Sequence, residues 1–309
     1  MVVLIIFKAG GMVFSMFIPQ WLVPRSARFL MMGDEASMNQ SVDNVRVTKH
    51  YGQGRFGQIH YRRAAPDVPS NHPPLILFHM SPYSGVIYEN LMADLGRDRV
   101  VIAVDTPGFG NSDAPLVPPT IQQYAAAMGD LLDGLKLRGV DVMGYHTGSK
   151  IGLDLCLQRP EQVRKIIMIS AAIWTDEELI EHRAQFAKAE VAADGSHLVK
   201  WWRAVGRWSM KGRTLEQMAD GFYARTMRPD ISWWGHNAAF GYKTAVALEK
   251  IDHEILILNP QDDLWDFTPR AKATLKNGHI HDLPGWSHGF LDVKTTETAK
   301  LVRGFLDAP

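Results

Sequence analysis

Gly139-Val140-Asp141-Val142-Met143-Gly144-Tyr145-His146-Thr147-Gly148-Ser149-Lys150-Ile151-Gly152 is the stretch that decides how this chain folds. A short apolar run ends in a turn flanked by two glycines, and a helix-like segment follows at once. Glycines two residues either side of His146 indicate a turn without room for a Cβ, with the central residue in a strained conformation. Such a turn raises its central side chain above the sheet, at a helix N-terminus where the dipole favours negative charge. The pattern predicts that His146 stands in a functional site.

Length and composition indicate a protein with a full hydrophobic core. The chain has 309 residues, 46% hydrophobic and 21% charged, which suffices for one large domain with an insertion or for two ordinary domains. Lys+Arg and Asp+Glu both number 33, so the net charge of +0 gives no electrostatic reason to expect nucleic acid or an acidic partner. The single cysteine, Cys156, excludes an intramolecular disulfide framework and a cysteine metal site.

Residues 1–40 are interpreted separately from the fold, as an apolar N-terminal extension. Basic Arg25 and Arg28 follow the apolar run, whereas a secretory signal has its basic residues in front. Lys8 and two prolines make the same run a poor membrane span. The first interpretation is translation from upstream of a true start at a later methionine, and the alternatives are a membrane anchor and a signal. We therefore expect no membrane association and a cytoplasmic location.

From Val45 onward the pattern predicts an α/β fold with a mostly parallel sheet. Two alternating runs at 45–51 and 56–62, joined by a glycine-rich turn, predict an antiparallel hairpin at the sheet edge. Later apolar runs lack alternation, which is typical of strands buried on both faces. These runs are 75–78, 100–104, 140–143, 166–169 and 255–258. Helical spacing of apolar residues at 121–135 supplies the strand–helix alternation of right-handed crossovers.

The alternation stops between about 175 and 251, a stretch that holds five of the nine tryptophans: Trp201, Trp202, Trp208, Trp233 and Trp234. We predict a helical lid at 175–251, inserted into a core formed by 41–174 and 252–309. The lid is expected over the carboxyl edge of the sheet, where such sheets place ligands. Together with side chains on the predicted edge loops, it predicts an apolar, aromatic substrate pocket. The pocket residues expected are Met80, Tyr83, Phe109, Tyr145, Trp174, Trp265 and Trp286.

Four motifs in a fixed order resemble those of the lidded α/β-hydrolases, the group of epoxide hydrolases, haloalkane dehalogenases, C–C bond hydrolases and small esterases. The most specific is the Asp-x-Pro-Gly-Phe-Gly-x-Ser-Asp loop at 105–113. The others are the loop at 79–82, the glycine-flanked turn at 144–148, and the Asp262-Asp263 pair followed by the histidine loop at 284–290. The resemblance runs from Val45 to the C-terminus and implies the α/β-hydrolase fold.

The resemblance also implies site residues, in the family's order of nucleophile, acid and base. His288 matches the general base, and Asp263 matches the acid that orients it, with Asp262 as the alternative. The backbone N–H groups of Ser81 and Thr147 match the oxyanion hole.

Two positions depart from the family pattern. Met80 replaces a glycine of the oxyanion loop, and His146 replaces the usual Ser, Asp or Cys nucleophile.

Other polar residues have simpler interpretations. His79 is expected to be a structural hydrogen-bonding residue beneath the oxyanion loop, and Asp105 and Asp113 are expected to brace turns. His279 and His281 share one face of a strand, a spacing that can suit a metal, but no carboxylate or third histidine lies near them in sequence. We therefore expect no metal and no cofactor.

A histidine at the turn leaves three mechanisms open. Neutral imidazole is nucleophilic, with an ordinary pKa of about 6.5, so His146 could form an acyl-imidazole that water activated by His288 hydrolyses. It could instead act as a base or hydrogen-bond donor without a covalent intermediate, or be inert in a ligand-binding protein. Because acid, base and glycines are retained, we predict a hydrolase for a small apolar, aromatic substrate with an ester, lactone or C–C bond. A cofactor-free lyase and a non-catalytic binding protein are the alternatives.

Overall fold

The computed structural model describes residues 2–9, 12–19, 45–188 and 190–309, in two units divided between Asp43 and Asn44. In the first unit, β1 (Val2–Ala9) and β2 (Met12–Pro19) pair as an antiparallel hairpin, which the sequence analysis did not predict. The rest of the predicted N-terminal extension, at 20–40, lies outside the described residues. Within the described ranges, no helix has the length and apolar character needed to cross a bilayer.

An eight-stranded sheet forms the centre of the second unit, in the order β10-β9-β8-β7-β5-β6-β4-β3. Its strands are β3 (Thr48–Gly54), β4 (Gly57–Ala64), β5 (Leu75–Phe78), β6 (Val101–Val104), β7 (Val140–Tyr145), β8 (Val163–Ile169), β9 (Glu254–Pro260) and β10 (Gly278–Leu283). β4 pairs antiparallel with β3 and β6, and the other pairs are parallel. The predicted edge hairpin and the five predicted buried strands are confirmed, and so is the α/β fold class.

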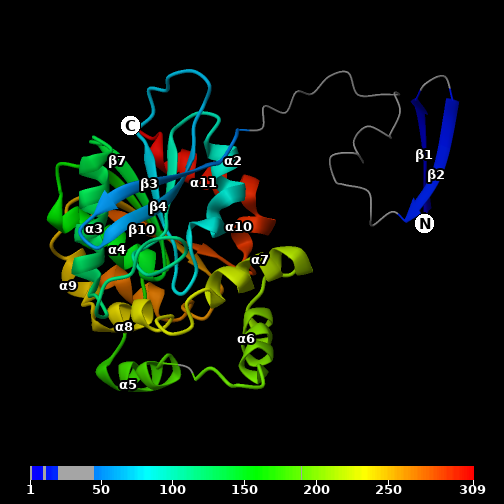
Figure 1. Ribbon diagram of the computed structural model, residues 1–309. Coiled ribbons are helices and arrows are strands. Elements are labelled where there is room, and N and C mark those ends of the chain that lie inside the picture. The colour runs from blue at the N-terminus through cyan, green and yellow to red at the C-terminus, as the bar shows by residue number, and fades with distance from the viewer. Residues whose placement is uncertain (1, 10–11, 20–44, 189) are drawn as a thin grey trace. The chain divides into compact units, whose positions relative to one another are not determined.

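Helices cover both faces of this sheet (Figure 1). α3 (Ile121–Gly134) and α4 (Thr147–Gln158) pack on one face, and α2 (Glu89–Leu95), α10 (Phe290–Val293) and α11 (Thr295–Leu306) on the other. The 3₁₀ helices η2 (Gly85–Tyr88) and η3 (Thr268–Ala273) complete the connections. Successive side chains of a strand point to opposite faces, so β5 supplies Ile76 and Phe78 to one core cluster and Leu75 and Leu77 to the other. This two-sided burial explains the continuous apolar runs.

Five helices lie between β8 and β9 in the sequence: α5 (Asp176–Gln185), α6 (Ser196–Arg207), α7 (Leu215–Thr226), α8 (Trp234–Gly241) and α9 (Thr244–Leu248). We call residues 175–251 the inserted helices. Thr175 is the N-cap of α5 and Thr214 is the N-cap of α7. Each forms a capping box that satisfies free N–H groups at the start of its helix. α5 to α8 gather along one edge of the sheet in Figure 1.

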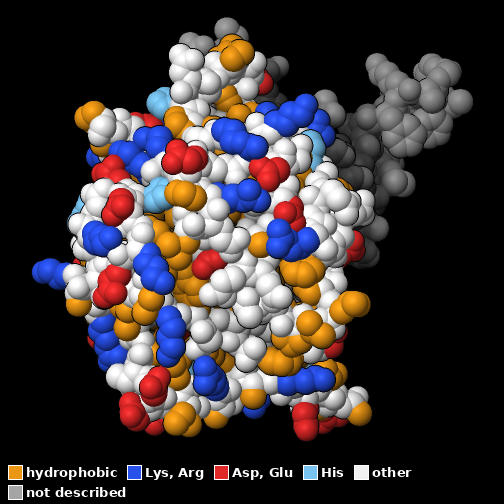
Figure 2. Space-filling view, turned by 90° about the vertical axis from the view of Figure 1, so that its left-hand side faces the viewer, with side chains coloured by type: hydrophobic (Ala, Val, Ile, Leu, Met, Phe, Trp, Pro, Cys, Tyr) orange, Lys and Arg blue, Asp and Glu red, His pale blue; other side chains and the backbone are white. Residues whose placement is uncertain are grey.

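Charges of both signs are interspersed over the face of the molecule that Figure 2 presents. Lys and Arg side chains alternate there with Asp and Glu, in keeping with the net charge of +0. This face therefore offers no extended basic stripe of the kind that follows a phosphate backbone.

The turn between β7 and α4 has the strained geometry that the sequence predicts. His146 has φ 48° and ψ −105°, a region that non-glycine residues rarely occupy. A Cβ on Gly144 would lie 2.2 Å from the carbonyl oxygen of Gly148, and one on Gly148 would lie 2.0 Å from that of Phe78. Both glycines are required because backbone passes directly over them.

We expect Gly148→Ala to destabilise the protein by about 1–3 kcal/mol, because β5 and α4 must separate to admit the methyl group. The matched control is Gly134→Ala at the end of α3, where no atom lies within 4 Å of the new Cβ. Alanine favours a helix more than glycine does, so the control should be neutral or slightly stabilising. Thermal unfolding measures both variants, and equal melting temperatures would contradict the close-approach argument.

Candidate active site

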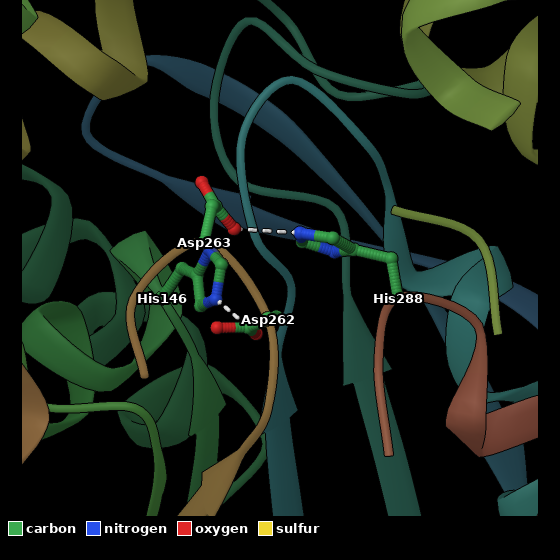
Figure 3. A group of neighbouring side chains, drawn as sticks. All are labelled: His146, Asp262, Asp263 and His288. Atoms are coloured by element: carbon green, nitrogen blue, oxygen red, sulfur yellow. Dashed lines mark hydrogen bonds and ion pairs between the residues drawn. The ribbon is translucent and has the colours of Figure 1, made fainter. Parts of the chain in front are cut away.

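Four side chains from three loops converge at the carboxyl edge of the sheet (Figure 3). His146 comes from the turn after β7, Asp262 and Asp263 from the loop after β9, and His288 from the loop after β10. Parallel strands end at the same edge, so residues far apart in sequence meet there. One nitrogen or oxygen from each lies within 4.8 Å of those of the other three. We call these four residues the His–Asp cluster.

The cluster consists of two separate histidine–aspartate pairs. Nε2 of His288 lies 2.7 Å from Oδ1 of Asp263, and Nε2 of His146 lies 2.9 Å from Oδ2 of Asp262. An ionised carboxylate only accepts hydrogen bonds, so each Nε2 carries the donated proton. The two rings are 5.3 Å apart and nearly perpendicular. Asp263 therefore pairs with His288. Asp262, the alternative acid for that histidine, pairs with His146 instead.

The two pairs differ in their exposure and electrostatics. The Asp262 side chain is 0% exposed and that of Asp263 is 34% exposed. Burial favours the neutral form of Asp263, but the hydrogen bond and charge of His288 hold the pKa of Asp263 well below its usual value. Burial likewise opposes charge on His288, yet its hydrogen bond to Asp263 and both carboxylate charges raise its pKa. The His288–Asp263 pair thus favours imidazolium and carboxylate.

Tyr145 lies next to both histidines of the cluster. Its buried ring lies 4.7 Å from the His146 ring and 6.1 Å from the His288 ring, and its hydroxyl lies 3.5 Å from Nδ1 of His288. Burial, with the charges of Asp262 and Asp263, raises the pKa of Tyr145 well above its usual value, so the hydroxyl keeps its proton. Tyr145 thereby limits the orientation of His288.

The two backbone N–H groups matched to the oxyanion hole lie beside the turn. Ser81 lies in the loop after β5, and Thr147 is the first residue of α4, where N–H groups have no partner within the helix. Among the described residues, no hydrogen-bond acceptor is found for either N–H. Met80, which stands where the family has glycine, is buried and its carbonyl accepts a hydrogen bond from His79 at 2.9 Å. This bond holds the loop in place.

The inserted helices contact these loops directly. A Cβ on Gly235 of α8 would lie 1.7 Å from Oγ of Ser81, so α8 packs against the oxyanion loop. The Met210 N–H donates to the His288 carbonyl at 2.8 Å, and the Ser287 hydroxyl donates to the Trp208 carbonyl at 2.6 Å. The segment between α6 and α7 is therefore bonded to the histidine loop.

His79 and Asp105 have structural contacts. The His79 ring is buried, with Nδ1 donating to the Met80 carbonyl and Nε2 accepting from the Thr106 N–H at 2.9 Å. Burial lowers the pKa of His79, in keeping with a neutral ring that both donates and accepts. Asp105 is buried and accepts from Nδ1 of His60 at 2.8 Å. Neither residue belongs to the His–Asp cluster.

The aromatic residues predicted for the pocket divide into two groups. Tyr83 and Phe109 are buried on the loops that surround the turn, and α8 packs close to Phe109. The tryptophans make other contacts: Trp174 packs 4.1 Å from the Phe267 ring, and Trp286 lines a cavity of about 640 Å³ between β10 and α11 that no cluster residue lines. Trp265 is half-buried, two residues after Asp263.

Sequence reasoning missed two residues of the inserted helices. His236 of α8 stacks on Phe186 at 4.4 Å, and burial, reinforced by the charge of Arg225, lowers the pKa of His236 to about 3. Arg225 of α7 lies over the Tyr83 ring at 5.9 Å and its charge also opposes protonation of His288. Neither residue falls within a motif, so only the packing of α7 and α8 places them near the cluster.

Comparison with known proteins agrees with this architecture. Residues 73–196 match the sequence profile of the alpha/beta hydrolase fold. Over this part of its length the chain is similar to the α/β-hydrolases, and the whole second unit has their fold. The enol-lactonase of Burkholderia xenovorans superposes with a TM-score of 0.70 at 18% identity, over 84% of this chain and 100% of that one. An esterase from Exiguobacterium antarcticum has a TM-score of 0.70 at 16% identity, with the same two coverages.

Relatives matched by sequence cover less of this chain than the structural neighbours do. A putative carbamate hydrolase of Caulobacter vibrioides is 23% identical over 67% of this chain and 80% of its own length. The 2-hydroxy-6-oxo-2,4-heptadienoate hydrolase of Pseudomonas putida is 30% identical over 32% of this chain and 37% of its own. Uncharacterised mycobacterial relatives, 29% identical, are matched over only 34% of their length.

We expect His79→Ala to lower the free energy of unfolding by about 1–3 kcal/mol, because the buried Met80 carbonyl and Thr106 N–H lose their partner. His72→Ala is the control, since the His72 side chain is 44% exposed and its loss should change stability by less than about 0.5 kcal/mol. Chemical denaturation gives both values. A His79 variant as stable as the control would show that this ring does not anchor the oxyanion loop.

Proposed function

We propose that this chain is a hydrolase for small, uncharged, apolar substrates, aromatic esters or lactones above all, with the attacking water activated at the His–Asp cluster. The observation that carries the proposal is the pair of imidazoles facing each other at the strained turn, each held by its own carboxylate. Cleavage of a C–C bond next to a carbonyl would use the same groups. Relatives and structural neighbours named as esterase, enol-lactonase and carbamate hydrolase support this class of reaction.

Covalent attack by His146 is the less favoured of the mechanisms that the sequence left open. Its Nε2, the ring nitrogen farther from the backbone, donates to Asp262 and so has no free lone pair. Nδ1 has a lone pair but lies next to Cβ, in a turn that backbone crowds on both sides. We therefore propose that water is the nucleophile, because its attack does not require a free lone pair on His146.

The proposed reaction has one proton path and one site for negative charge. In its neutral form His288 donates from Nε2 to Asp263, and its Nδ1 takes a proton from water while the water oxygen attacks the carbonyl carbon. The N–H groups of Ser81 and Thr147 stabilise the resulting oxyanion, helped by the N-terminus of α4. The bond to the leaving group then breaks, and the leaving group takes up the proton. Under this proposal the inserted helices act as a lid, supported by the packing of α8 on Ser81.

We expect turnover on a panel of aryl and alkyl esters and lactones. His288→Ala and His146→Ala should each lower kcat/KM on the order of 10²-fold or more, because both remove a group that handles the proton or orients water. His281→Ala, on edge strand β10 and outside the cluster, is the control and should retain wild-type rates.

Rapid quenching with mass spectrometry tests the non-covalent step. We expect no acyl group on the peptide that contains His146, since Asp262 occupies Nε2. An adduct there would establish covalent catalysis instead. Full activity of His288→Ala would refute the proposed site, and a retained ligand without turnover across the panel would identify a binding protein.

A further inference from the structure

Activation of water by His288 requires one carboxylate, that of Asp263, yet the His–Asp cluster contains a second, Asp262. Asp262 is fully buried, with Oδ2 facing His146 and Oδ1 accepting the Leu264 N–H at 2.8 Å. Burial of an ionised carboxylate costs free energy unless an opposite charge compensates it. An acid without a function would therefore be expected at an exposed position. The buried second carboxylate therefore requires an explanation.

The four side chains form a donor set of metal-binding type. They offer two imidazole nitrogens and two carboxylate oxygens, all within 4.8 Å of one another. A tetrahedral ion with bonds of about 2.1 Å places its ligand atoms about 3.4 Å apart. The 2.7 and 2.9 Å contacts within the two pairs need only lengthen slightly, and the longer distances between pairs need to contract by side-chain rotation.

Charge in the cluster points the same way. A divalent cation bound at the two Nε2 atoms displaces the protons that these atoms donate to Asp262 and Asp263. With both imidazoles then neutral and both carboxylates ionised, the four residues carry a net charge of −2, which the cation balances. The loop after β9 presents Asp262 and Asp263 consecutively, so the two acids cannot separate from each other. His279 and His281 lack this arrangement: among the described residues, the His–Asp cluster is the group with three or more such ligands at metal-binding separation.

We propose that His146, Asp262, Asp263 and His288 bind one divalent transition-metal ion, of which Zn²⁺, Fe²⁺ and Mn²⁺ accept this donor set. The site explains the histidine at the turn: a metal lowers the pKa of bound water to about 7, so the turn has to present a ligand rather than a hydroxyl nucleophile. The Tyr145 hydroxyl, 3.5 Å from Nδ1 of His288, is placed to orient the ligating ring through its second nitrogen.

The metal site itself does not depend on the proposed function. Only the reaction of the bound water rests on it. In that reaction the ion takes water as a fifth ligand beside the four side chains. This water loses a proton to solvent, and its oxygen attacks the carbonyl carbon. The single bond between the acyl carbon and the alkoxy oxygen of the ester breaks, and the leaving alcohol takes a proton from solvent. No oxidant or other co-reactant is needed.

The test is calorimetric titration of chelator-treated, full-length protein with Zn²⁺ and Mn²⁺, with bound metal counted by elemental mass spectrometry. We expect one ion per chain and at least tenfold weaker binding for His146→Ala and for the nearly isosteric Asp262→Asn, both checked for folding by circular dichroism. The His279→Ala/His281→Ala double variant is the matched control, since it removes two imidazoles outside the cluster, and it should bind as the wild type does.

The outcomes separate this inference from the proposed function. No binding by the wild type, undiminished binding by His146→Ala and Asp262→Asn, or loss of binding in the control would each overturn the site. Full hydrolysis by protein shown to contain no metal would overturn the metal's role and leave the hydrolase proposal standing. One bound ion that depends on the cluster, without hydrolysis of any substrate, would support the site and contradict the hydrolase.

Discussion

The close approach of α4 to β5 is the constraint on which the site depends. Gly148 lies so near the carbonyl of Phe78 that no side chain fits, and Gly144 lies equally near Gly148. This contact forces the chain to turn directly from β7 into α4, which places His146 in its strained conformation. It also leaves the Thr147 N–H at the start of a helix, pointing to where negative charge can be stabilised. One backbone contact therefore positions both the imidazole and an N–H donor.

The pairing of each imidazole with its own carboxylate sets the chemistry that is open to the site. Asp263 favours the protonated form of His288, while Asp262 accepts a hydrogen bond from Nε2 of His146, so that nitrogen has no free lone pair. The usual division into one nucleophile, one acid and one base does not describe such a cluster. Water, activated by the cluster or by a metal that the cluster holds, is the nucleophile that fits it.

The inserted helices contact two of the loops that form the site. The Met210 N–H is bonded to the His288 carbonyl, and α8 packs on Ser81, so both the histidine loop and the oxyanion loop are fixed by residues between β8 and β9. Movement of α8 or of the α6–α7 segment would therefore displace the groups at the reaction centre.

The sequence by itself determined the features that depend on short-range patterns. Buried strands show as continuous apolar runs, and the tight turn shows as glycines around His146, because each is dictated by neighbours in the chain. Tertiary structure alone decided which of two consecutive acids meets which histidine, since both follow the same strand and only the loop's conformation separates them. It also decided that Trp286 lines a groove beside α11, that α8 packs on Ser81, and that β1 and β2 pair. Those outcomes rest on contacts between distant residues or on loop conformation, which no local periodicity encodes.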